Sequence, residues 1–125
     1  MNRLTGFSPL VRKVITERAA YSPGDVAICE VQVDCLGSLA VQHHHRRPRG
    51  SGGSRRPETN GAANGLAVCG PCHLWIETNR KEALAAGWLV PQHRTPSEIP
   101  VRRRGVRVML ADDGFLIEIP ELEVS

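Results

Sequence analysis

The chain of 125 residues has few aromatic side chains: two Phe, two Trp and one Tyr. A chain of this length forms one domain with at most a short extension. Its middle section is rich in Gly and Arg and has few large apolar residues, so it can bury little apolar surface. A small domain of this kind needs a further constraint, such as a bound metal ion.

The chain also lacks a long apolar run. No stretch reaches the about 18 apolar residues of a membrane span, and the N-terminus lacks the apolar core of a secretion signal. We therefore expect a cytoplasmic protein with no membrane partner, whose thiols stay reduced. Four cysteines in such a protein indicate a metal site before they indicate disulfides.

Acidic residues are missing from the most basic stretch. Between His43 and Arg56 lie five Arg and three His, whereas from Ala111 onward there are five acids and no base. A basic centre favours a polyanionic partner, and nucleic acid is the default. A solvated loop is the alternative interpretation of the same residues.

The local pattern predicts an α+β fold. Ser8 is a suitable N-cap and Pro9 a suitable first residue for a helix that ends near Ala20. Asp113-Gly114 is typical of a tight hairpin turn. The other expected elements are a turn at 22–25, strands at 26–33, 39–44 and 66–68, a helix at 72–86 with Gly87 as C-cap, and hairpin strands at 102–110 and 115–119.

The cysteines form two pairs. Cys69 and Cys72 are separated by two residues, whereas Cys29 and Cys35 are separated by five, wider than the usual spacing in a structural zinc site. A loop of five residues can still return to one ion, so we expect Zn²⁺ bound by Cys29, Cys35, Cys69 and Cys72. The alternatives are a half-site without metal, or cysteines buried as small apolar residues.

Two other chemistries use similar cysteine patterns. Cys69-Gly70-Pro71-Cys72 before a helix also matches a redox pair, but Val68 stands where thioredoxins usually carry Trp. Zinc deaminases need a His-x-Glu before a Pro-Cys-x-x-Cys, and the chain has neither in that form.

Residues 8–90 combine a histidine cluster at 43–45, a lone Asn64, and His73 directly after the Cys69–Cys72 pair. This order and spacing resemble the HNH endonucleases in their ββα-metal form, and most closely the small HNH proteins of phages. The resemblance implies a small zinc-stapled ββα-metal nuclease domain over residues 1–90. Residues 91–125 would then be a linker, a β-hairpin and an acidic C-terminal extension.

The resemblance also implies an activity. Such enzymes hydrolyse DNA phosphodiester bonds with a divalent cation, by nicking or cutting, with weak sequence preference and with 5′-phosphate and 3′-hydroxyl products. It further suggests a phage protein in the host cytoplasm that acts with the packaging terminase. We expect no small-molecule cofactor.

Carried onto this chain, the motif assigns His45 as the general base and His44 as a metal ligand, with His43 outside the pattern. His73, and with less support Glu77, would complete the site of one catalytic Mg²⁺, Mn²⁺, Ni²⁺ or Zn²⁺. Asn64 would stiffen the loop between the strands and help to hold the base.

The residues leave alternatives to these roles. Alternation along a strand puts His43 and His45 on one face, so His44 and His45 share a site only where the strand ends or bulges. Asn64 could be a turn residue, and Asn60 is the competing asparagine, at the wrong spacing for the motif. Glu77 could simply form an exposed helical pair with Lys81.

Five arginines near the histidines are expected to neutralise DNA phosphates without reading bases. These are Arg46, Arg47, Arg49, Arg55 and Arg56. Residues 102–104 form a second basic cluster that could extend this footprint. The leading alternative function is a non-catalytic zinc module that binds DNA or a protein, which would keep the cysteines and be indifferent to His45.

Overall fold

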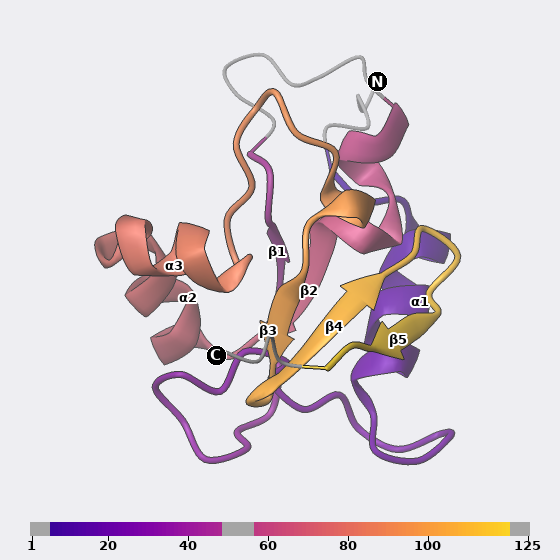
Figure 1. The fold of residues 1–125 in the computed structure, drawn as a ribbon. Helices are drawn as coiled ribbons and strands as arrows, with labels where there is room; N and C mark the ends of the chain where they lie inside the picture. The colour runs from indigo at the N-terminus through magenta and orange to yellow at the C-terminus, as the bar shows by residue number, and fades with distance from the viewer. Residues whose placement is uncertain (1–5, 49–56, 121–125) are drawn as a thin grey trace, which may run out of the picture.

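The computed structural model describes residues 6–48 and 57–120 (Figure 1). Within them the protein has the predicted small α+β fold, with three α-helices and two antiparallel sheets. The elements in chain order are α1 (Pro9–Ala19), β1 (Gln42–His45), η1 (Pro57–Asn60), η2 (Ala62–Asn64), β2 (Gly65–Val68), α2 (Gly70–Thr78), α3 (Arg80–Ala86), η3 (Pro96–Glu98), β3 (Val101–Arg103), β4 (Val106–Leu110) and β5 (Leu116–Glu118).

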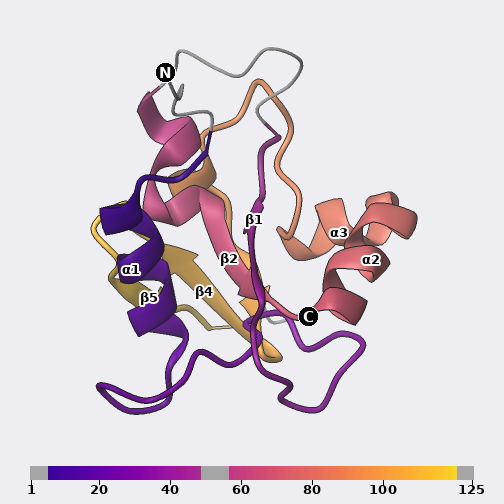
Figure 2. The same ribbon diagram turned by 180° about the vertical axis from the view of Figure 1, so that it is seen from behind.

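The first sheet pairs β1 with β2 in a regular register that runs from Gln42 opposite Val68 to His45 opposite Gly65. Side chains alternate between the two faces of such a ladder. His43 and His45 therefore face α1, whereas His44 faces α2. Figure 2 shows β1 with α1 on one side and α2 and α3 on the other. Among the described residues β1 pairs only with β2, so its other edge carries no strand.

Helix α1 begins as the sequence predicts. The Ser8 hydroxyl accepts a hydrogen bond from Val11 N at 3.2 Å, and Pro9 opens the helix. Ile15 and Ala19 are buried with Phe7 in a small core that α1 forms against Ala67 of β2. This core covers the α1-facing side of the first sheet.

The main core joins the predicted nuclease domain to the predicted extension. Leu66 and Val68 of β2 pack with Leu89 in the same buried cluster as Val101 and Leu110 of the second sheet. That sheet has the order β3-β4-β5, and the expected hairpin around Asp113-Gly114 is its β4-β5 part. The single strand expected over 102–110 is instead divided by a turn at Arg104 and Gly105 into β3 and β4. The described parts of residues 1–90 and of residues 91–125 therefore share one core.

The helix expected over 72–86 is two helices. The first of them, α2, begins at Gly70 and ends at Thr78, and its C-cap Asn79, with φ −130° and ψ 56°, separates it from α3. Trp75 O accepts both the backbone N–H and the side-chain amide of Asn79, each at 2.9 Å, so Asn79 caps the end of α2. Gly87 is the expected left-handed C-cap, with φ 81°. In the described part of the chain no helix is long and apolar enough to cross a membrane.

The strand expected over 26–33 does not form and leaves only isolated bridges at Ala27 and Ile28. Successive residues bond to different segments instead. Ile28 N donates to Ala19 O, Cys29 N to Ser38 O, and Glu30 N to Ala67 O. These three hydrogen bonds connect the apolar segment to α1, to the loop before β1 and to β2, and they position Cys29 near the other cysteines.

A buried carboxylate ties this winding segment to both sheets. Glu30 is fully buried and receives Arg18 at 2.7 and 2.8 Å, Arg103 Nε at 2.7 Å and Ala67 N at 3.0 Å. Burial alone would raise the pKa of Glu30, but the two arginines and the Ala67 amide hold it at about 2. Arg103 is thus structural.

Candidate functional site

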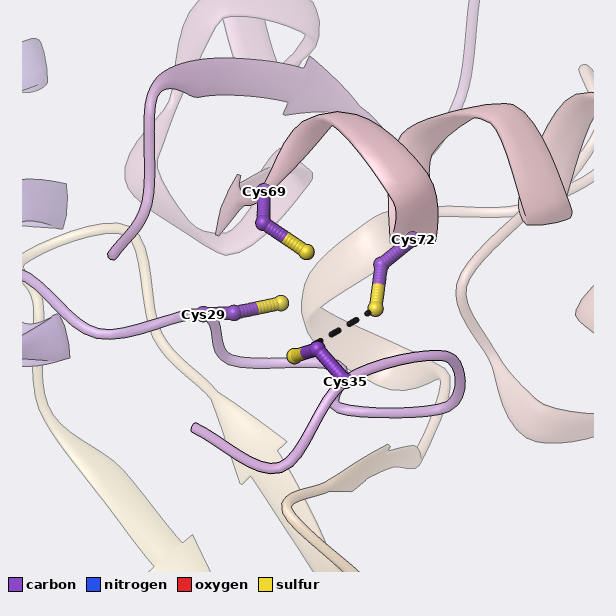
Figure 3. A group of neighbouring side chains, drawn as sticks. All are labelled: Cys29, Cys35, Cys69 and Cys72. Atoms are coloured by element: carbon purple, nitrogen blue, oxygen red, sulfur yellow. Dashed lines mark hydrogen bonds between the residues drawn. The ribbon is translucent and has the colours of Figure 1, made fainter. Parts of the chain in front are cut away.

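The four cysteines meet at the start of α2 (Figure 3). Cys69 is the N-cap of α2 and Cys72 lies in its first turn, while Cys29 and Cys35 come from the loop that precedes β1. One sulfur from each lies within 4.8 Å of the other three, and none is in a disulfide. The widened spacing between Cys29 and Cys35 does not keep them apart.

The geometry of this cluster fits Zn²⁺. Tetrahedral Zn²⁺ with Zn–S bonds of about 2.3 Å places sulfurs about 3.8 Å apart, and Cys72 Sγ lies 3.7 Å from Cys35 Sγ. Gln32 N and Asp34 N approach Cys29 Sγ and Cys72 Sγ at 3.4 and 3.3 Å, as amides do around thiolate ligands. Gln32 has a left-handed φ of 55°, which turns the wide loop back.

The thiols differ in their affinity for protons. Burial raises the pKa of Cys35, but hydrogen bonds from the amides of Gly37 and Ser38, together with those of the Cys69 and Cys72 side chains, lower it to about 7. Burial is the largest cause that raises the pKa values of Cys69 and Cys72. A cation that holds the cluster must therefore displace protons from the two helix cysteines, so its binding depends on pH.

A second group of potential ligands is His44, His73 and Glu77, whose ligand atoms lie within 4.8 Å of one another. His44 comes from β1, and the other two lie one turn apart on α2. His73 Nε2 is 3.7 Å from Glu77 Oε1, and the rings of His44 and His73 meet edge to face at 5.2 Å. The three ligands proposed from the motif are thus brought together.

The hydrogen bonds of each imidazole to residues outside the ligand group determine which ring nitrogen can bind a metal ion. His44 Nε2 lies 2.8 Å from Trp88 O, a pure acceptor, so this nitrogen carries the hydrogen and Nδ1 the lone pair. His73 Nδ1 lies 2.6 Å from Gln42 Oε1, which leaves Nε2 to face Glu77. Two oriented imidazoles and a carboxylate could hold a divalent cation.

His44 is held in the neutral form that a metal requires. It is 4% exposed, and burial lowers its pKa to about 4 despite the hydrogen bond to Trp88 O. A neutral imidazole at physiological pH needs no deprotonation before it binds a cation.

His45 lies on the other face of β1. Its ring stacks on Phe7, with centroids 3.9 Å apart and planes 6° apart, and its Nε2 is 3.0 Å from Asn60 Oδ1. β1 continues through His45 without a bulge. The structure therefore places the predicted base and the predicted ligand His44 on opposite faces of the same strand.

Asn64 fastens the loop that follows β1. Its Oδ1 accepts from Arg47 N at 2.7 Å, and its Nδ2 donates to Arg47 O at 3.0 Å and to Thr59 O at 2.7 Å. Its own carbonyl accepts from Arg46 N at 2.8 Å. It contacts the backbone that continues from His45 and stands directly before β2, so the stiffening role and the turn role coincide in one residue.

Arg46 is a structural residue. Its side chain is fully buried and donates to the carbonyl oxygens of Gly87, Ala63, Pro96 and Ile99 at 2.7 to 3.1 Å. Burial lowers its pKa to about 9, so it still carries its charge at neutral pH. A guanidinium with this many carbonyl partners holds the segment after α3 against the β1–β2 sheet.

Arg47 is buried as well, at 1% exposure, and donates to Arg94 O and to Thr59 Oγ1. The prediction that Arg46 and Arg47 contact DNA phosphates is therefore wrong, because neither guanidinium reaches the surface. Arg49, Arg55 and Arg56 lie outside the described residues, so for them the prediction stays open. Arg104 is also engaged, by Cys29 O and Ile28 O.

Sequence reasoning undervalued Asn60 and did not identify Phe7 as a partner of His45. The motif spacing selects Asn64, yet Asn60 is the asparagine at the His45 ring. Asn60 is the last residue of η1, the short helix that Pro57 begins. No local signal connects Phe7 to a residue so far along the chain.

No protein-family model, no curated protein and no solved structure matches the chain.

Proposed function

We propose that the protein is a metal-dependent endonuclease of the HNH type that hydrolyses phosphodiester bonds in DNA. One observation carries the proposal: His44, His73 and Glu77 gather within 4.8 Å from two elements far apart in the sequence, with His45 next in the chain. The zinc-type cysteine cluster at the start of α2 fixes the helix that presents His73 and Glu77.

The position of the histidines suits a displacement at phosphorus. In such a reaction the attacking water and the leaving oxygen lie on opposite sides of the phosphorus atom. A phosphate lying across the free edge of β1 would meet His45 from one face and the ligand group from the other. A cation held by His44, His73 and Glu77 would supply Lewis-acid stabilisation of the phosphate and the departing 3′ oxygen.

In this proposal His45 is the general base, since imidazole takes a proton near neutral pH. The parallel Phe7 ring keeps its plane, and Asn64 keeps the backbone that follows it in place. His44 lies one residue away but is engaged by Trp88 O and the ligand group, so the two histidines do different work.

Phosphate contacts then come from exposed basic side chains and not from Arg46 or Arg47. Arg12 on α1 is exposed and lies near β1, where burial and then the charge of Arg12 lower the pKa of His43. Arg12 and the arginines at 49, 55 and 56 are the proposed backbone contacts.

The test is cleavage of supercoiled plasmid by zinc-loaded protein with Mg²⁺, Mn²⁺ or Ni²⁺, with and without chelator. Wild type is compared with His45→Ala and with His93→Ala, a matched change at an exposed histidine. We expect metal-dependent nicking that His45→Ala abolishes and His93→Ala retains. Loss of the base should cost about 10²- to 10⁴-fold in rate.

The opposite results are equally specific. Cleavage that survives His45→Ala would remove His45 from the role of base. No cleavage by folded, zinc-loaded wild type with any cation would favour the alternative, a zinc module that binds DNA or a protein without catalysis.

A further inference from the structure

The contacts of the His45 imidazole include two from outside β1. Asn60 Oδ1 lies 3.0 Å from Nε2, and the Phe7 ring stacks on the imidazole with planes 6° apart. The stack fixes the plane of the ring, and the hydrogen bond fixes its rotation within that plane. We propose that Asn60 is the positioning residue of His45 and sets its tautomer, with the hydrogen on Nε2. The inference rests on the proposed function, in which His45 is the base.

The chemistry of the amide decides the tautomer. A side-chain carbonyl oxygen can only accept, so the ring nitrogen that meets it donates. A neutral imidazole with hydrogen on Nε2 has its lone pair on Nδ1. An amide makes this selection without adding negative charge, whereas a carboxylate at the same place would repel the phosphate that His45 has to approach.

Asn60 is held in position through the residue before it. Thr59 is buried, with its carbonyl bonded to Asn64 Nδ2 at 2.7 Å and its hydroxyl to Arg47 Nη2 at 2.9 Å. After Asn60, the Asn64 amide closes a turn onto Gly61 O at 3.0 Å. The two asparagines thus have different roles. Asn64 holds the backbone of the loop, and Asn60, at the end of η1, holds the ring of His45.

The contact of Asn60 with His45 differs from the contacts of another half-buried asparagine, Asn79. Asn60 is half-buried at the end of η1, and it reaches across to a strand fifteen positions earlier in the chain. Asn79, the matched half-buried asparagine, bonds only within its own helical segment, to Trp75 O and Thr78 Oγ1. Removal of the Asn79 side chain should therefore leave His45 unaffected.

The tautomer is measured directly by long-range ¹H–¹⁵N correlation of histidine rings in full-length, zinc-loaded protein without DNA. We expect His45 in the Nε2–H form in wild type and in Asn79→Ala, and a mixture of both forms in Asn60→Ala. Asn60→Asp keeps an acceptor oxygen and should restore the Nε2–H form. If Asn60→Ala does not fold, Asn60→Ser, whose side chain is too short to reach the ring, takes its place. An Nδ1–H form in wild type, or an unchanged tautomer in the shortened variant, overturns the proposal.

Plasmid cleavage gives the second readout. Asn60→Ala should lower kcat by about 10- to 100-fold with little change in KM, a smaller loss than removal of the base itself. Asn60→Asp restores the tautomer but adds a negative charge that repels the phosphate, so its kcat should stay below that of wild type. A wild-type kcat in Asn60→Ala would contradict a positioning role. Failure of wild type to cleave would overturn the nuclease proposal alone, because the tautomer is read without substrate.

Discussion

His44 and His45 are adjacent in the chain but point to opposite faces of β1. The His44 ring meets His73 of α2 and bonds to Trp88 O, whereas the His45 ring stacks on Phe7. The regular pairing of β1 with β2 imposes this division. Each histidine therefore belongs to a different set of neighbours, and each should fail separately when it is substituted.

The first prediction separates metal binding from base chemistry. His44→Ala removes one of three ligands for the proposed catalytic cation, so Mn²⁺ affinity measured by calorimetry on zinc-loaded protein should fall by at least about 10-fold. His45→Ala should bind Mn²⁺ as wild type does, because its ring faces away from the ligand group. An equal loss of affinity in both variants would show that the two histidines share one site.

The second prediction concerns stability against pH. Burial lowers the pKa of His44 to about 4 from its ordinary 6.5, so the native state binds fewer protons than the unfolded state between these values. The contribution of His44 to the free energy of unfolding is therefore fully present above pH 6.5. As the pH falls toward 4, the free energy of unfolding decreases by up to about 3 kcal/mol through this group. His44→Gln, which can still donate to Trp88 O, should show a flatter urea-denaturation profile between pH 7 and pH 5. A slope identical to that of wild type would contradict this assignment.

The third prediction concerns the cysteine cluster. Cys29→Ser should lower zinc content as strongly as Cys72→Ser, because Cys29 Sγ belongs to the same group despite its wide spacing from Cys35. Apparent zinc binding in small domains reaches about 10–16 kcal/mol, so loss of one thiolate should also collapse the thermal transition. Zinc content is measured by mass spectrometry, with Ser38→Ala as the control at an exposed position of the same loop. Full zinc content in Cys29→Ser would remove that residue from the ligand set.

Elements that depend on local signals could be predicted from the sequence. Ser8-Pro9 predicts the start of α1 and Asp113-Gly114 predicts the turn between β4 and β5, and both are found at these positions. The ligand groups were also accessible to sequence reasoning. Two residues one helical turn apart, such as His73 and Glu77, lie side by side on any helix.

The arginines could not be predicted in the same way. Arginine is almost never fully buried unless paired, and the partners of Arg46 are carbonyls spread from Ala63 to Ile99. The sequence therefore predicts that basic residues at 46–47 lie on the surface. In the structure the segment after α3 covers them. The winding of 26–33 is hidden for the same reason, since Glu30 bonds to Arg18 and Arg103 from distant segments.

The fourth prediction follows from this correction. Arg46→Lys should lower the free energy of unfolding by several kcal/mol, because one ammonium cannot bond to four carbonyls spread around a planar fork. The same variant, while folded, should keep the salt dependence of DNA binding. Arg12→Gln should do the reverse: stability unchanged, and the slope of log K against log salt reduced by about one. A reduced slope in Arg46→Lys would restore Arg46 as a phosphate contact.

The last prediction concerns Glu30, the buried acid that joins α1, β2 and β3. Glu30→Gln leaves the guanidinium groups of Arg18 and Arg103 buried near the core without their counter-charge. Removal of one partner from a buried ion pair costs about 3–5 kcal/mol, so urea denaturation at pH 7 should show a loss in that range. Glu82→Gln, at an exposed position of α3, should change stability by less than about 0.5 kcal/mol.

Because Glu30 also accepts a hydrogen bond from the amide of Ala67, opposite His43 in the first sheet, loss of Glu30 should loosen the strand that carries the histidines. Faster amide hydrogen exchange at residues 43–45 would show this, and unchanged exchange with the same loss of stability would confine the role of Glu30 to α1 and the second sheet.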